Sequence, residues 1–182
     1  MKDGIIPPII NEIMEFIASK GVLTEGIFRK SASISELQDM KNRINHGKKV
    51  IVAEHDPIAI AALLKLFFRE LETPVFGNDV AAMMDVHIIG KDLNQSELAL
   101  MVKNYIIPLL PLENRIILKA LCHLLWKVAE NSAQNLMSTS NLAVVMTPNL
   151  FRSTNMADEF RIFGSSQMIL CCIIDTFPQV FE

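Results

Sequence analysis

Apolar residues recur at three- and four-residue steps along most of this chain, and this spacing constrains the fold more than any other feature of the sequence. The first such stripe runs through Ile9, Ile13 and Phe16 and ends at Gly21. No stretch alternates apolar and polar residues with the period of two that marks a half-buried β-strand. We therefore predict an all-α fold, a single-domain helical bundle of about seven to nine helices that occupies residues 1–182.

Capping and proline chemistry predict where two helices begin. Ser33 followed by Glu36 has the spacing of a capping box, in which each side chain accepts a hydrogen bond from the backbone of the other residue. Asp56-Pro57 combines a capping residue with a proline in the first turn, and it opens a strongly apolar helix. Further helices are expected at 96–107, with Ser96 as cap, and at 111–131. Another should begin at Ser138 or Ser140 and be stopped by Pro148, and the last should span 165–177. A short segment is also expected at 78–89.

Composition excludes several classes of protein. A chain of 182 residues with 51% hydrophobic and 20% charged residues can bury a full core. A net charge of −3 gives no support to nucleic-acid binding. The apolar stretches stop well short of a membrane span, and the N-terminus does not resemble a signal peptide. Three cysteines without metal-ligand spacing fit a reducing compartment. We therefore expect a cytoplasmic protein, which could be recruited to membranes.

The charge is distributed unevenly along the chain. Residues 20–49 hold seven basic and three acidic residues, a formal charge of +4, whereas the remainder of the chain carries −7. A local positive field on an acidic protein suits a partner that is anionic at one spot. A solvated basic face without a partner is the alternative, and charge alone does not separate the two.

One arginine in this basic segment stands on a loop. In "LTEGIFRKSAS", residues 23–33, Arg29 follows the apolar pair Ile27 and Phe28 and precedes a small polar run. Gly26 marks the stretch as a turn. The two apolar neighbours suggest a loop whose ends are anchored in the core while Arg29 points outward.

A second unusual feature is a pair of like charges in the most apolar predicted helix. Lys65 and Arg69 are four residues apart in "IAIAALLKLFFREL" and therefore lie on one helix face. Like charges at this spacing destabilise an isolated helix by a few tenths of a kcal/mol. Either both side chains extend along the core edge to reach water, or they face an anionic partner. The sequence does not decide between these two readings.

Motifs of self-contained enzymes are missing from the sequence. It has no phosphate-binding GxxxxGK[ST] or GxGxxG loop, no HExxH and no nucleophile elbow. The four histidines are scattered and none has metal-ligand spacing. We therefore expect no metal and no cofactor of its own, and we do not expect an enzyme in its own right.

Four motifs in order resemble the RhoGAP domain, the GTPase-activating domain for Rho-family small GTPases. "GVLTEGIFRKSAS" resembles the finger-loop signature of that family, and "LLKLFFRELETPVF" resembles its Lys-x-x-x-Arg-Glu-Leu helix. "LPLENRIILKALCHLL" is similar to its later Leu-Pro-x-x-Asn helix, and "MSTSNLAVVMTPNLF" to its Asn-Leu-Ala block with Pro-Asn-Leu. Together these motifs are spread over residues 21–151, which is most of the length of the chain.

This resemblance implies a function and a set of site residues. It implies an activator that supplies a catalytic arginine, Arg29, in trans to the active site of a GTP-bound Rho-family GTPase. GTP and Mg would belong to that partner. Lys65, Arg69 and Asn149 would meet the GTPase, with Arg69 bracing the finger loop and Asn149 offering its amide to the switch region. Loop support would come from Glu25, Gly26 and Phe28, whereas Asn114 is read as structural. The sequence does not determine the oligomeric state, and a monomer is the default.

The chain departs from the family pattern at one block. Met146-Thr147 stands where the family usually has Phe-Gly, and Thr would be unfavourable if that position required a left-handed backbone. The chain also starts close to its first helix, so we expect a domain cut from a longer protein. Two other functions compete with the activator: a RhoGAP-like module that docks on partners without stimulating hydrolysis, and a helical scaffold that never meets a GTPase.

Overall fold

The computed structural model describes residues 6–77, 80, 83, 84, 88, 90–151 and 156–182, except for the side chains of residues 156–162. Nine α-helices lie in this part of the chain, and no strand longer than a single bridge pair does. The predicted all-α class is therefore confirmed. The α-helices are α1 (Pro8–Phe16), α2 (Ile34–Asn45), α3 (Pro57–Arg69), α5 (Gln95–Met101), α6 (Leu112–Glu130), α7 (Ser132–Asn135), α8 (Thr139–Leu150), α9 (Met156–Asp175) and α10 (Phe177–Phe181). The short helical turns are the π-helical Ile17–Gly21 and Val102–Ile106 and the 3₁₀ turns Val52–Glu54 and Ile107–Leu109.

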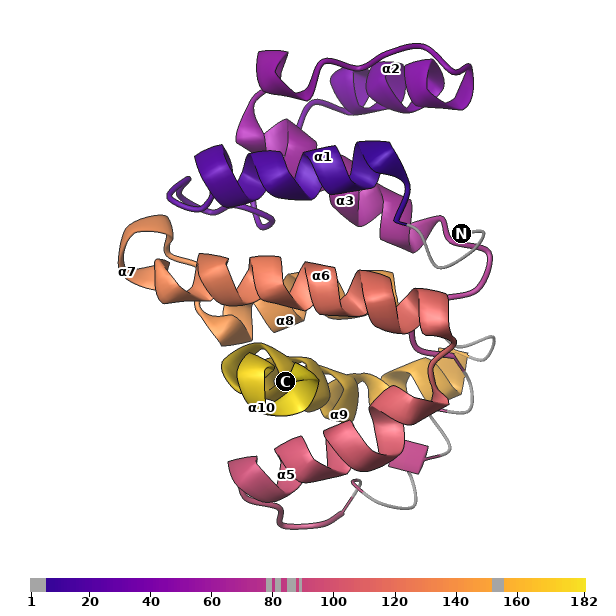
Figure 1. Cartoon of the computed structure of the whole chain (residues 1–182), viewed down its shortest axis with the longest axis vertical. Coiled ribbons are helices and arrows are strands. Elements are labelled where there is room, and N and C mark those ends of the chain that lie inside the picture. Colours follow the sequence, from indigo (N-terminus) through magenta and orange to yellow (C-terminus); the bar gives the residue numbers. More distant parts are fainter. Residues whose placement is uncertain (1–5, 78–79, 81–82, 85–87, 89, 152–155) are drawn as a thin grey trace.

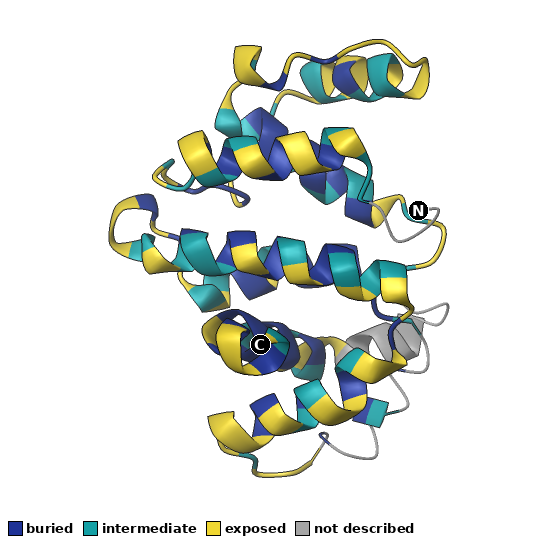
Figure 2. Cartoon of the chain, in the orientation of Figure 1, coloured by how far each residue is buried: buried dark blue, intermediate teal, exposed yellow. Residues whose placement is uncertain are grey.

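The helices stack along the longest axis of the molecule (Figure 1). The α2 helix lies at one end, α1 and α3 follow, α6 and α8 form the middle, and α9, α10 and α5 complete the other end. The α3 helix packs against α1 and α2 on one side and against α8 on the other, and α8 in turn packs against α6 and α9. Each helix buries one stripe of residues and exposes the opposite one (Figure 2).

The α3 helix is central because its sequence is apolar on most sides. Asp56 caps it through a 2.7 Å hydrogen bond from the Ile58 amide to its carboxylate, and Pro57 occupies the first turn, as predicted. Seven of its side chains are buried among the neighbouring helices. Only a narrow face remains for Lys65 and Arg69, which fixes where these two charges can point.

The capping box predicted for α2 is wrong. Ser33 is at the N-cap, but its side chain makes no capping bond, and its hydroxyl lies 2.8 Å from that of Ser35. Glu36 turns away from the helix start and pairs with the ring of His55 at 2.9 Å. Glu36 thus bonds a partner 19 positions away in sequence in place of the backbone at the helix start. The helix therefore starts where predicted, without the predicted bonds.

Two other boundaries differ from the expectation. The cap of α5 is Asn94 and not Ser96: Asn94 and Glu97 form a complete capping box with two 3.0 Å bonds. Pro148 does not stop α8, which continues to Leu150. Pro148 lacks the amide that would have bonded to the carbonyl of Val144, a residue that is 50% exposed.

The C-terminal helix begins earlier than the predicted 165–177. The α9 helix starts at Met156 and runs through Gly164, and a separate short helix, α10, follows it. A glycine inside a helix costs about 1 kcal/mol relative to alanine, which the buried face after Ser165 outweighs. Most of the predicted segment 78–89 lies outside the described residues.

Candidate functional site

The loop between the π-helical turn after α1 and the start of α2 carries Arg29, and we call residues 22–33 the arginine loop. Gly26 is buried and has φ +70°, a left-handed conformation that suits glycine. Its carbonyl accepts hydrogen bonds from the amides of Arg29 at 2.9 Å and of Lys30 at 2.8 Å. A Cβ at Gly26 would come within 2.9 Å of the Lys30 side chain. The predicted supporting role of Gly26 thus has a concrete geometry, a tight turn from residue 26 to residue 29.

The two apolar residues before Arg29 are anchored in the core. Ile27 and Phe28 are both 0% exposed, whereas Arg29 is exposed. Phe28 is the third residue of the turn and has φ +66°, where glycine or asparagine is the usual residue. A left-handed bulky residue costs about 1–2 kcal/mol, which burial of the ring must offset. This unusual backbone lets Phe28 face the core while the next side chain faces solvent.

Lys65 contacts the arginine loop directly. Its Nζ donates a short hydrogen bond to the carbonyl oxygen of Phe28. The side chain is half-buried, and burial lowers the pKa of Lys65, with the positive charge of Arg69 adding to the shift. The resemblance implied that Arg69 braces the loop; the contact from α3 to the loop that the described residues show is made by Lys65. Arg69 is exposed at the last residue of α3.

Glu25 and Lys30 close the exposed side of the turn. Their carboxylate and ammonium groups are 3.1 Å apart, with side chains 59% and 49% exposed. A pair this exposed contributes between about 0 and 1 kcal/mol. Glu25 therefore lies where loop support was expected, but the buried contacts of Phe28 and Lys65 hold the loop more strongly.

Asn149 does not present its amide outward. The residue is only 6% exposed, and its Nδ2 donates to the carbonyl of Val145 one helical turn earlier, at 2.8 Å. Among the described residues, no hydrogen bond or ion pair joins Asn149 to Arg29, Lys65 or Arg69. The structure thus joins the arginine loop to α3 through Lys65, with Arg69 one helical turn further along α3, whereas Asn149 belongs to the adjoining helix α8.

The Met146-Thr147 pair fits a helical backbone. Both residues are buried inside α8, and among the non-glycine residues described only Phe28 and Leu136 have positive φ. The left-handed conformation that would have excluded Thr is therefore not required. The Oγ1 of Thr147 is buried and has no hydrogen-bond partner in the described part of the chain.

Asn114 has the structural role that the sequence suggested. Its amide donates to the carbonyl of Val75 at 2.9 Å and holds the segment after α3 against the start of α6. The next residue, Phe76, forms a parallel bridge to Phe151, and the two rings stack at 4.0 Å. These contacts fix the end of α8 relative to the end of α3.

No motif pointed to Asn135, which contacts the arginine loop from the C-terminal end of α7. Its backbone carbonyl accepts a 2.7 Å hydrogen bond from the amide of Gly26, and its side chain is fully buried. The partners of its side chain are backbone atoms, one of them 113 positions away in sequence. Helical periodicity carries no information about such contacts.

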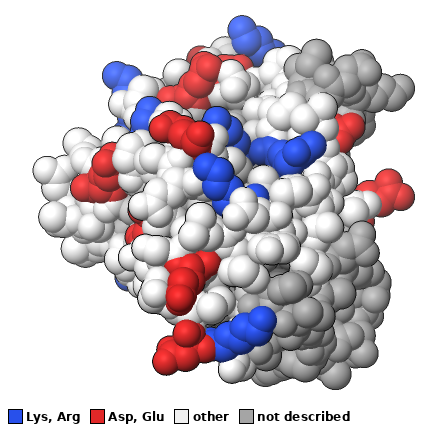
Figure 3. All heavy atoms as spheres, turned by 60° about the horizontal axis from the view of Figure 1, so that its bottom comes forward, with Lys and Arg blue, Asp and Glu red and all other residues white. Residues whose placement is uncertain are grey.

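The charges of the basic segment are partly compensated. Lys41 pairs with Glu70 of the α3 terminus at 2.5 Å, and the Arg43 guanidinium donates to the carbonyl of Lys49. Figure 3 shows one face of the molecule, on which the basic side chains gather in the upper part with acidic ones among them. The basic surface is thus a mixed one with local positive points, such as Arg29 and Arg69.

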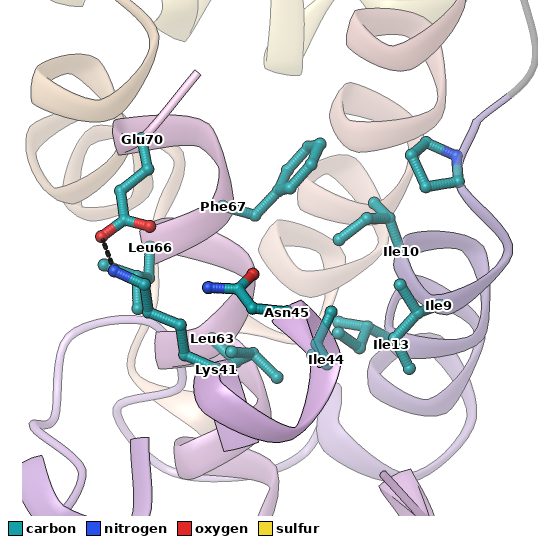
Figure 4. A pocket seen from close by; sticks show the side chains of 11 residues that line it. Ile9, Ile10, Ile13, Lys41, Ile44, Asn45, Leu63, Leu66, Phe67 and Glu70 are labelled. Atoms are coloured by element: carbon teal, nitrogen blue, oxygen red, sulfur yellow. Dashed lines mark hydrogen bonds and ion pairs between the residues drawn. The ribbon is translucent and has the colours of Figure 1, made fainter. Parts of the chain in front are cut away.

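A cavity of about 260 Å³ lies between α1, α2 and α3 (Figure 4). Its walls are mainly apolar, with Ile13 from α1, Ile44 from α2 and Phe67 from α3, and the Lys41–Glu70 ion pair lies at its edge. None of Arg29, Lys65 and Arg69 lines it, although Lys65 and Phe67 share a helix. The cavity is therefore separate from the candidate site.

Within the described ranges, no group of three or more His, Cys, Asp or Glu side chains is arranged to hold a metal ion. None of the helices described is both long enough and apolar enough to cross a bilayer.

The chain resembles known proteins in sequence and in fold. The model of the RhoGAP domain family matches residues 7–155. Rho GTPase-activating protein gacR of Dictyostelium discoideum is 30% identical over 97% of this chain and 23% of its own length. Rho GTPase-activating protein 68F of Drosophila melanogaster is 34% identical over 85% of this chain and 32% of its own length. The chain therefore spans less than a third of these two relatives.

Solved structures agree with the fold. The crystal structure of human Rho GTPase activating protein 15 superposes with a TM-score of 0.88 at 24% identity and covers 97% of this chain and 84% of that one. The BH domain of GRAF, the GTPase regulator associated with focal adhesion kinase, gives a TM-score of 0.79 at 24% identity over 95% of this chain and 92% of its own. Because the family match extends over most of the helices that hold the arginine loop in place, this chain belongs to the RhoGAP domain family.

Proposed function

We propose that this chain stimulates GTP hydrolysis by a Rho-family small GTPase in its GTP-bound form, and that Arg29 is the catalytic residue it supplies. The observation that carries the proposal is the turn of residues 26–29, in which an exposed arginine directly follows two residues with 0% exposure. The nucleotide and its Mg²⁺ belong to the partner. The family membership and the names of the relatives support the same activity.

The physical problem in GTP hydrolysis is charge. Negative charge on the transferring phosphoryl group is incompletely neutralised in a small GTPase, and an arginine inserted in trans is worth on the order of 10³ to 10⁵ in rate. A planar guanidinium can bond the phosphate and a backbone carbonyl at the same time, which an ammonium cannot. The exposed position of Arg29 leaves its guanidinium available for this task.

Positioning is the second requirement. An arginine on a loose loop would lose much of the advantage of being placed before the reaction. Here the backbone on either side of Arg29 is fixed by the buried ring of Phe28, the bond from Lys65 to its carbonyl and the turn closed by Gly26. Arg69, exposed one helical turn beyond Lys65, adds a second positive charge that can meet an anionic partner surface.

The experiment compares Arg29→Ala and Arg29→Lys with the parent in single-turnover GTP hydrolysis at saturating domain, across a panel of Rho-family GTPases. We expect Arg29→Ala to lower the stimulated rate by about 10² or more, with a much smaller loss of affinity for the GTP-bound partner because the guanidinium acts where transition-state charge develops. Arg29→Lys should restore little of the rate.

A matched control is Arg115→Ala. Arg115 is also exposed, but it lies near the start of α6, about 22 Å along that helix from the end that leads to α7 and the arginine loop. Arg115→Ala should leave the stimulated rate of GTP hydrolysis and the affinity for the GTP-bound partner near the parent values. The arginine mechanism would be refuted if Arg29→Ala stimulated GTP hydrolysis at a rate within about threefold of the parent rate. Equal losses of affinity and rate would instead favour a docking module that does not stimulate hydrolysis.

A further inference from the structure

Asn135 is a buried asparagine whose amide is fully used. It is 0% exposed and sits at the C-terminal end of α7. Its Nδ2 donates to the carbonyls of Val22 and Val128, both at 2.7 Å, and its Oδ1 accepts from the amide of Met137 at 2.7 Å. Both amide hydrogens and one oxygen lone pair are therefore satisfied, and among the uncharged side chains only a primary amide offers two donors and an acceptor in one plane.

These three bonds join three separate parts of the fold. Val22 begins the arginine loop, Val128 lies in the last turn of α6, and Met137 leads into α8. The left-handed residue Leu136, with φ +59°, turns the chain so that the amide of Met137 can reach back. Asn135 is consequently fixed to the helical core on one side and to the beginning of the arginine loop on the other.

The backbone of Asn135 extends this connection toward Arg29. Its carbonyl accepts the Gly26 amide at 2.7 Å, and the Gly26 carbonyl in turn accepts the Arg29 amide at 2.9 Å. A displacement of residue 135 would thus be passed to the peptide of Arg29 through two hydrogen bonds and one peptide unit. Lys65 holds the same turn from the side of α3 through the carbonyl of Phe28.

We propose that Asn135 is a positioning residue: through Val22 and Gly26 it sets the backbone orientation from which Arg29 reaches the partner. This inference rests on the proposed function and adds a second, distant determinant of the rate. Its physical basis is that a catalytic group must be held close to its productive geometry, so that a small shift of the supporting backbone lowers the rate of the chemical step.

A buried, fully bonded asparagine could instead serve stability alone. The two roles predict different kinetics. A purely structural residue lowers the folded fraction and leaves the folded molecules with the parent rate at saturation. A positioning residue lowers the maximal rate of fully folded domain, changes the half-saturating concentration little, and has no further effect once Arg29 is removed.

The first variant is Asn135→Ser, whose hydroxyl is too short to reach Val22 and Val128 together. The matched control is Asn114→Ser, which removes another amide-to-carbonyl bond from α6, the one to Val75. In single-turnover assays below the unfolding temperature, we expect Asn135→Ser to lower the maximal stimulated rate about tenfold or more, with half-saturation within about threefold of the parent. Asn114→Ser should stay within about threefold of the parent in both quantities.

Two further measurements test the route of the effect. In an Arg29→Ala background, Asn135→Ser should change the residual rate by less than about twofold, because the group being positioned is already missing. Amide hydrogen exchange of Gly26 should become about tenfold faster in Asn135→Ser, while exchange in the interior of α3 stays at the parent rate.

Several outcomes would overturn the inference. The first is a maximal stimulated rate of Asn135→Ser that equals the parent rate. The second is an equal decrease of this rate in Asn114→Ser. The third is a decrease by the same factor whether Arg29 is present or replaced by Ala. Asn135→Ala, which places no charge beside the carbonyls of Val22 and Val128, serves if Asn135→Ser does not fold. If neither variant folds, Asn135 is a folding residue and the positioning role falls. A large loss from Arg29→Ala with none from Asn135→Ser would remove only this inference, whereas no loss from Arg29→Ala would remove the proposed function as well.

Discussion

The left-handed conformation of Phe28 makes a prediction about two truncations at the same position. Phe28→Ala and Phe28→Gly both delete a fully buried ring, and each should lose about 3–5 kcal/mol of unfolding free energy. At ordinary positions Gly is the less stable of the two by about 0.5–1 kcal/mol. At φ +66° the order should invert, because Ala retains a backbone penalty of about 1–2 kcal/mol that Gly does not have. The unfolded chain has more conformational entropy with Gly than with Ala, which reduces this advantage of Gly. We therefore expect Phe28→Gly to be more stable than Phe28→Ala by about 1 kcal/mol.

Urea unfolding followed by circular dichroism would measure this difference, with a stabilising osmolyte present if the variants are close to their unfolding transition. The matched control is Leu64, which is also 0% exposed but lies inside α3. There, Leu64→Gly should be less stable than Leu64→Ala by about 1 kcal/mol. If Phe28→Ala were as stable as Phe28→Gly or more so, the positive φ, and with it the turn that presents Arg29, would be wrong.

Three other predictions concern stability, loop bracing and association. Thr147→Val should raise the unfolding free energy by about 1 kcal/mol, because it removes a buried hydroxyl with no partner in the described chain; a lower thermal midpoint would contradict this. Lys65→Met should change stability by less than about 1 kcal/mol, since the lost bond to Phe28 is offset by no longer burying a charge. It should nevertheless lower the maximal stimulated rate about tenfold, and an unchanged rate in single-turnover assays would exclude bracing by Lys65. If residues 20–49 steer an anionic partner, the stopped-flow association rate should fall with added salt, as screening acts over about 8 Å at physiological ionic strength; a flat on-rate would exclude steering.

The fold class and the exposure of Arg29 followed from local sequence, because both depend on short-range patterns. Helical periodicity placed the helices, and the apolar pair Ile27 and Phe28 next to an arginine predicted a turn with one exposed charge. Asp56-Pro57 fixed a helix start because both residues act within the first turn of α3. Local chemistry of this kind requires no knowledge of distant contacts.

Other features could not be predicted because distant partners decide them. Glu36 leaves its predicted cap for His55, 19 positions away. The bond from the Lys65 ammonium to the carbonyl of Phe28, 37 positions away, is likewise a contact that local sequence does not reveal. Asn149 satisfies its amide within its own helix, a choice that its position in a Pro-Asn-Leu motif does not reveal.

The bond between Gly26 and Asn135 also has a consequence for the order in which the protein becomes competent. Arg29 emerges from the ribosome long before α7 does, so a nascent chain that ends within α6 carries the arginine on a loop with neither its Val22 nor its Gly26 restraint. Contacts between positions so far apart also require the closure of a long loop, which costs chain entropy. If Arg29 is the catalytic residue, we therefore expect stimulation of GTP hydrolysis to require a chain that extends beyond α7.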